Sequence, residues 1–240
     1  MALTTVPRSR YLAVLLAGAL GCASGDLLLP EPPGGENVQL SKVEGDGQEG
    51  TVGEQLPNPL VVKVLNSREE PAIGRQVAFV ITSPVEAVTP DTVITNSAGL
   101  ATGNVVLGTS PGDYVIQARL VVSADSIQTQ EFTVEAKPAA PDTLSPLSPQ
   151  SQPGRRGRIA AAPPSVRVVD RFGNAVPGVP VAWQVIAGEG ETSESISRTT
   201  AEGTSTVEWK LGNRIGVQKL TATIEQATGR PVTFTVTVLF

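Results

Sequence analysis

Few side chains in this 240-residue sequence have types suited to chemistry. It contains no histidine and a single cysteine, Cys22. Histidine is the commonest general base and a leading metal ligand, so its absence removes every His-dependent triad and most zinc sites. A lone cysteine can form no disulfide within the chain. We therefore expect no enzyme, no catalytic residue, no metal site and no cofactor.

One acidic segment has a composition found in cation sites. The stretch "EGDGQE" places Glu44, Asp46 and Glu49 among glycines. Oxygen-rich loops flanked by glycine can bind calcium, but this one lacks the acidic spacing and the final glutamate of an EF-hand. The alternatives are a calcium loop and an ordinary polar loop.

A small basic cluster is the candidate for ligand contact. Arg155, Arg156 and Arg158 lie close together in "QSQPGRRGRIAAAPP", beside proline and glycine. Three such charges are usually part of a solvated loop. The functional alternative is that the arginines contact an anionic surface polymer.

The two tryptophans could stack on a sugar or fill a core. Trp183 and Trp209 each stand in phase with aliphatic neighbours, and aromatic residues make up only 4% of the chain. Carbohydrate-binding modules usually display several aromatic side chains. We therefore expect both tryptophans to be buried.

Composition limits the class of protein. The net charge is −5, which provides no basic footprint for nucleic acid. Val, Thr, Gly and Pro are prominent, with 24 Gly and 20 Pro, and this favours strands joined by tight turns. The expected fold class is all-β.

The first residues have the features of an export signal. Arg8 and Arg10 precede a short apolar stretch at residues 11–20. That stretch is too short to span a bilayer of about 30 Å, which needs roughly 20 residues. We predict a signal peptide at residues 1–21, followed by a flexible tether at residues 22–36.

The end of the apolar stretch, "ALGC" at residues 19–22, resembles the lipobox of bacterial lipoproteins. That resemblance implies cleavage before Cys22, acylation of this cysteine and anchoring to a membrane. Two or more acyl chains convert marginal membrane binding into stable anchoring. Ala23, rather than Asp, is similar to the sorting pattern for the outer membrane. The expected location is the cell envelope, as an outer-membrane or cell-surface lipoprotein.

The body of the chain contains an internal repeat. Val77, Phe79 and Ile81 match Val181, Trp183 and Val185, 104 residues further on. The same separation relates many later pairs, and only near the end does it become 102. A separation kept over most of a domain indicates duplication. We predict two modules, at residues 37–136 and 137–240.

Each module alternates apolar and polar residues. In "VTFTV", for example, Phe234 and Val236 alternate with threonines. Such alternation is typical of strands with one buried and one solvated face, as in a sandwich of antiparallel sheets. About seven short strands in roughly 100 residues is the count of an immunoglobulin-like sandwich.

The motif order in the second module identifies a family resemblance. "DRFGNAVPGVPVAW", "TAEG", "WKLG" and "VTFTV" resemble the bacterial Ig-like domains of the invasin and intimin type, group 1. In the first module "NSREEPAIG" lacks the Gly-Asn turn and Phe79 replaces the tryptophan. We expect that loss to loosen the first hairpin while leaving the fold intact.

The resemblance implies adhesion, or spacing for adhesion. An alternative is a recognition or accessory subunit, including one serving a secreted hydrolase, that binds a surface polymer or a partner protein through loops or an edge strand. The expected partners are the membrane, through a lipid on Cys22, and a surface protein or polymer. Neither nucleic acid nor a small-molecule substrate is expected.

Overall fold

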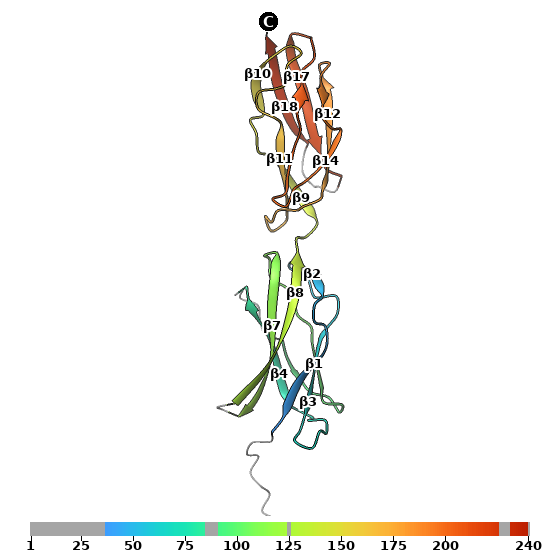
Figure 1. The fold of residues 1–240 in the computed structure, drawn as a ribbon, viewed down its shortest axis with the longest axis vertical. Coiled ribbons are helices and arrows are strands. Elements are labelled where there is room, and N and C mark those ends of the chain that lie inside the picture. Colours follow the sequence, from blue (N-terminus) through green and yellow to red (C-terminus); the bar gives the residue numbers. More distant parts are fainter. Residues whose placement is uncertain (1–36, 85–90, 124–125, 226–230, 240) are drawn as a thin grey trace, which may run out of the picture. The chain divides into compact units, whose positions relative to one another are not determined.

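The computed structural model describes residues 37–84, 91–123, 126–225 and 231–239 (Figure 1). The predicted signal peptide, Cys22 and the tether lie outside these residues. The described part consists of strands and connecting turns without a helix, which confirms the all-β prediction. Within this part, accordingly, no helix has the length and apolarity needed to cross a membrane.

The first module, residues 37–136 by prediction, forms two sheets. The strands of the smaller sheet, in spatial order, are β1 (Gln39–Glu44), β3 (Leu60–Leu65) and β6 (Leu100–Gly103). The strands of the larger sheet, in spatial order, are β2 (Glu49–Thr51), β8 (Ser126–Lys137), β7 (Gly112–Ser123), β4 (Gln76–Ser83) and β5 (Asp91–Ile94).

The second module, residues 137–240 by prediction, repeats this strand order. Its three-stranded sheet contains β15 (Thr204–Thr206), β11 (Ser165–Asp170) and β9 (Pro141–Pro146). Its five-stranded sheet contains, in spatial order, β10 (Ser151–Arg155), β18 (Val232–Leu239), β17 (Gly216–Thr223), β12 (Pro180–Ala187) and β14 (Ile196–Arg198). A two-stranded sheet adds β13 (Glu191–Thr192) and β16 (Trp209–Lys210).

The period-two pattern determines which side chains enter the core. Leu220 of β17 is paired with Phe234 of β18 in an antiparallel ladder, and both are buried. Their neighbours Thr221 and Thr233 are also paired and face the opposite side of the sheet. Adjacent strands therefore present their apolar residues to the same face, and that face packs against the smaller sheet.

Each module contains its own hydrophobic core. The first core includes Phe79 and Phe132, whose ring centroids lie 6.4 Å apart. The second includes Trp209 and the pair Trp183 and Phe234, with ring centroids 6.1 Å apart. Both tryptophans are thus buried, as predicted from their phase.

The first module does not contain the expected hairpin. β3 and β4, like β11 and β12, lie in different sheets, so the stretch between them crosses from one sheet to the other. The turn is also not loosened. Asn66 N donates to Glu70 O at 2.9 Å, and Asp170 N donates to Asn174 O at the same distance in the second module. The prediction of a looser turn was wrong because other side chains replace the Gly-Asn pair.

Candidate functional site

The predicted arginine cluster lies at the end of β10, an edge strand that pairs in parallel with β18 (Figure 1). Arg155 is the last residue of β10, and Arg156 and Arg158 belong to the turn that follows. All three side chains are exposed. Within the described part of the chain, none of the three guanidinium groups has a hydrogen-bond or ion-pair partner. They are therefore free to bind an anion.

Backbone hydrogen bonds hold the turn that carries these arginines. Arg158 N donates to Arg155 O at 3.2 Å, and Leu211 N donates to Arg158 O at 2.9 Å. Ala160 N donates to Trp209 O at 2.8 Å. The turn is thus tied to the segment of β16, and its backbone is positioned before any ligand arrives.

A buried glutamine fixes the neighbouring loop. Gln218 is only 1% exposed. Its Oε1 accepts from Gly212 N at 2.9 Å, and its Nε2 donates to Gly212 O at 3.1 Å and to Arg214 O at 3.0 Å. Gly157 N in the arginine turn donates in turn to Gly212 O at 3.4 Å. The support of the arginine turn therefore reaches the core of the sandwich.

A hollow of about 450 Å³ opens beside β10. Arg155 and Arg158 line it together with apolar residues. Two of these, Ile159 and Leu239, are 54% and 53% exposed. A hollow of this size, with an apolar wall and a few polar groups, has the general character of a ligand site.

The far side of Ile159 is acidic. A smaller hollow of about 190 Å³ shares Ile159 and is lined by Glu191, Glu208 and Lys210. Lys210 Nζ donates to Glu191 at 2.7 Å, and this hydrogen bond lowers the pKa of Glu191. Two glutamates and one lysine thus line the hollow next to the arginines.

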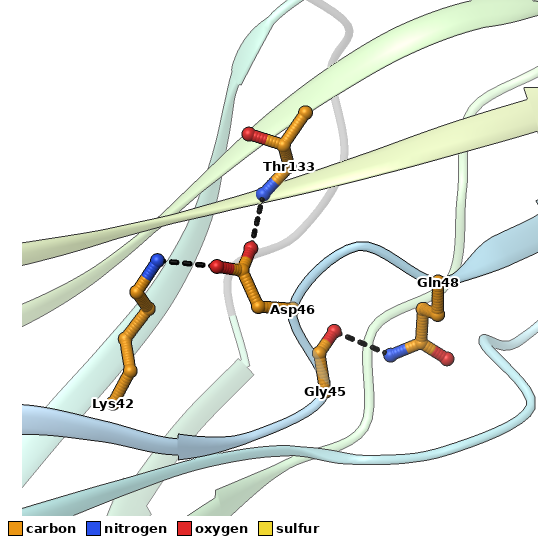
Figure 2. Close-up of polar contacts among 5 residues, drawn as sticks. All are labelled: Lys42, Gly45, Asp46, Gln48 and Thr133. Atoms are coloured by element: carbon orange, nitrogen blue, oxygen red, sulfur yellow. Dashed lines mark hydrogen bonds and ion pairs between the residues drawn. The ribbon is translucent and has the colours of Figure 1, made fainter.

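In the loop between β1 and β2, which belongs to the acidic segment, the carboxylate of Asp46 bonds to other groups of the protein. Figure 2 shows the side chain of Lys42 directed at Asp46, with which it forms an ion pair. The other carboxylate oxygen of Asp46 accepts from the backbone N of Thr133 in β8 at 2.9 Å. The bonds from Lys42 and Thr133 lower the pKa of Asp46. Gln48 closes the loop by donating to Gly45 O at 2.8 Å.

The acidic side chains weighed as a calcium loop each have their own surroundings. The Oε1 atom of Glu49 lies 3.8 Å from the Nζ atom of Lys137, with which it forms an ion pair. Among the described residues, the structure brings no three acidic, histidine or cysteine side chains into a group that could hold a metal ion. Through Asp46 and Thr133, the loop after β1 is fastened to β8.

Two stretches match the residue pattern of known functional motifs but not the structural context that these motifs need. Residues 45–50, "GDGQEG", match G-x-G-x-x-G, and residues 108–112, "GTSPG", match G-x-S-x-G. The first motif binds phosphate at the start of a helix, whereas here it leads into the strand β2. The second requires a strand-to-helix elbow and a histidine, and here it joins β6 to β7 in a chain without histidine.

Sequence reasoning found the arginines but missed the residues that complete their surroundings. Ile159, Leu239 and Gln218 were not predicted to take part. The one signal available was that Ile159 follows the cluster directly in "GRRGRI". The contributions of Leu239 and Gln218 depend on strand pairing far along the chain.

Comparison with known families places the second module. The family model of the bacterial Ig-like domain (group 1) matches residues 159–237. This range includes β11, β12 and nearly all of β18. Residues 159–237 therefore match a group 1 bacterial Ig-like domain, and the resemblance seen in the motifs of this module is confirmed. No protein of curated function matches the chain.

Several solved structures are similar to this chain at low sequence identity. FdeC, an Escherichia coli adhesin, has a TM-score of 0.51 and 15% identity, over 84% of this chain and 63% of that one. InvE, an adhesin of Yersinia pseudotuberculosis, has a TM-score of 0.38 and 21% identity, over 85% of this chain and 59% of that one. The D00-D0 domain of intimin has a TM-score of 0.38 and 13% identity, over 82% of this chain and 98% of that one. The likeness to FdeC is one of fold alone.

Proposed function

We propose that this chain is an exported, non-catalytic protein of the bacterial cell envelope. Its two Ig-like modules act in surface adhesion or as a structural spacer, and a lipid on Cys22 anchors them to a membrane. The observation that carries the proposal is the group 1 Ig-like domain at residues 159–237. The adhesin FdeC has a similar fold, which is compatible with this role.

The physical basis of the anchor is the acylated cysteine. Acyl chains contribute about 0.8 kcal/mol for each buried CH₂ group, so two or three chains bind a membrane stably. The chain has one cysteine, and it follows the apolar stretch at residues 11–20. Residues 22–36 then act as a tether that holds the modules away from the membrane.

The anchor is tested by substitution and labelling in cells. The Cys22→Ser variant should move from the membrane fraction to the soluble fraction and should not incorporate labelled palmitate. Ser24→Ala, two residues away, is the matched control and should remain in the membrane. Wild-type protein that incorporates no palmitate would refute the lipid anchor.

A second function is favoured by the hollow beside β10. Free arginines and exposed apolar side chains at one place suit a recognition subunit, which binds a surface polymer or a partner protein.

A further inference from the structure

We propose that the Arg155–Arg158 turn and the hollow beside β10 bind an acidic polysaccharide, that is, a sugar polymer bearing carboxylate or phosphate groups. This inference rests on the recognition alternative of the proposed function. It does not require the lipid anchor, because the site lies wholly within the second module.

The charge of the site fits a polymer with repeated anionic groups. Arg155, Arg156 and Arg158 are exposed and free, although the chain as a whole carries a net charge of −5. A guanidinium group binds carboxylate or phosphate through two parallel hydrogen bonds. Three such groups on one short turn can each contact a different charge along a polymer.

The arginines are not needed to form the turn. The first module builds the same backbone frame, in which Leu107 N donates to Glu54 O at 2.9 Å, as Leu211 N does to Arg158 O. Glu54 thus occupies the position of Arg158 with the opposite charge. The frame forms with either residue. The turn of the second module therefore does not need the positive charge of Arg158 in order to fold.

The apolar side chains fit the C–H faces of sugar rings. Ile159 and Leu239 stand more than half exposed next to the arginines. Burying such side chains against a ligand is favourable, because apolar surface is removed from water. An acidic sugar offers both features, a charged group for arginine and apolar ring faces for the wall of the hollow.

An extended peptide fits this edge less well. A peptide that adds a strand to a sheet needs a continuous row of free backbone groups. Pro153, in the middle of β10, has no N–H. Gln152 next to it donates to Ala162 O at 2.7 Å and accepts from Ala162 N at 2.8 Å, so its side chain holds the adjoining segment at this place.

A flat anionic membrane also fits less well. Glu191 and Glu208 line the neighbouring hollow on the other side of Ile159. A bilayer surface covering the arginines would also approach these carboxylates and be repelled by them. A narrow polymer can follow the arginine side alone.

The test is binding of the purified chain carrying Cys22→Ser to polygalacturonate, measured by calorimetry at low salt. In the same background, Arg155→Gln, Arg156→Gln and Arg158→Gln together should weaken binding about 10-fold or more, since each exposed ion pair contributes modestly. The matched control combines Arg68→Gln, Arg167→Gln and Lys219→Gln. It removes the same charge from exposed positions away from the hollow and should change binding less than about 2-fold.

A second variant tests the apolar wall. Ile159→Ser with Leu239→Ser should weaken binding about 3-fold and leave its salt dependence unchanged. Both side chains are exposed, so folding should be unaffected. The intrinsic tryptophan fluorescence of Trp183 and Trp209 verifies that each variant remains folded.

Several outcomes would overturn the proposal. One is equal loss of binding in the control triple variant, which would indicate non-specific charge attraction. Others are equal or tighter binding to poly-L-glutamate, to phosphatidylglycerol vesicles or to double-stranded DNA, which would assign the site to a peptide, a membrane or a nucleic acid. Absence of binding to polygalacturonate and to a phosphate-bearing polysaccharide would also reject it. Each result is independent of palmitate labelling, so failure here leaves the lipid anchor standing.

Discussion

The turns after β3 and β11 are built on the same backbone with exchanged side chains. In the second module Asp170 accepts from Phe172 N at 2.9 Å, and from Asn174 N at 2.8 Å and Asn174 Nδ2 at 2.9 Å. In the first module Asn66 takes the place of the aspartate and donates to Glu70 Oε2 at 3.2 Å. The carboxylate and the amide have changed places. The turn therefore requires complementary hydrogen-bonding groups rather than particular residues.

The exchange has a conformational cost in the first module. Glu69 has a φ of 61°, while the matching Gly173 has a φ of 86°. A residue with a Cβ is strained in this left-handed region, where glycine is not. The first module thus keeps the turn at the expense of local strain.

The loops before β7 and β17 are likewise held by different side chains in the two modules. Tyr114 OH donates to Ser110 O at 2.8 Å, and Gln218 Nε2 donates to Arg214 O at 3.0 Å. Tyr114 and Gln218 are both fully or almost fully buried, at 0% and 1% exposed. A phenol and an amide therefore fasten the same loop, each by reaching its carbonyl groups.

The largest effect on stability is expected from a substitution at Gly103, where the two cores differ. A Cβ on Gly103 would lie 2.3 Å from the Phe79 ring, whereas the matching position of the second module is the buried Val207. Gly103→Val should lower the unfolding free energy of the first module by about 3 kcal/mol, because the ring cannot move aside without strain. Hydrogen exchange of β4 and β6 measures it.

Tryptophan fluorescence supplies the control, since Trp183 and Trp209 both lie in the second module. The unfolding midpoint of the second module should not change in the Gly103→Val variant. A matching shift of both signals would show that the two cores unfold as one.

The next effect concerns Asp170, which is 2% exposed. Burial by itself raises the pKa of this carboxyl, but hydrogen bonds from Asn174, Ala139 and Phe172 outweigh it and hold the pKa below its usual value. Asp170→Asn should lower the unfolding free energy of the second module by about 2 kcal/mol at pH 7, because donors then face an amide N–H. Urea unfolding followed by tryptophan fluorescence measures it.

The pH dependence of that variant follows from linkage. A depressed folded pKa contributes stability above the unfolded pKa of about 3.9, and this is lost as pH falls through the folded pKa. The gap between wild type and Asp170→Asn should therefore narrow in acid. An equal gap at pH 7 and pH 3 would mean that the charge of Asp170 contributes nothing.

A smaller effect is expected at Tyr114. Tyr114→Phe removes the hydrogen bond to Ser110 O and should cost about 1 kcal/mol. Hydrogen exchange in the loop before β7 measures the loss. Gln218→Met removes three hydrogen bonds and should cost about twice as much in the second module. If Tyr114→Phe were neutral, the likeness between the two loops would be one of shape only.

The smallest expected effect is an increase in the stability of the first module. Glu69→Gly relieves the left-handed strain but adds freedom to the unfolded chain, so it should stabilise the first module by about 0.5 kcal/mol. The reciprocal Gly173→Ala should destabilise the second module by about 1 kcal/mol. Thermal unfolding by calorimetry compares them. Destabilisation by Glu69→Gly would show that the side chain of Glu69 contributes more than its strain costs.

The parts of the fold that follow local patterns were predictable. Alternation placed Phe234 and Val236 in the core, and the repeat paired Phe79 with Trp183. The exchange at Asn66 was misjudged, because the missing glycine was visible in the sequence and the compensating bond to Glu70 was not. Of the candidate site, the arginines were found and the hollow was not.

The strand-rich class, the repeat of 104 residues and the aromatic residues that fill each core can be read from the amino-acid order, because they depend on neighbouring residues. The pairing of β10 with β18, which places Arg155 opposite Leu239, is known from the three-dimensional structure alone. Such pairings join distant parts of the chain and are selected by burial of whole sheet faces, which no local pattern records.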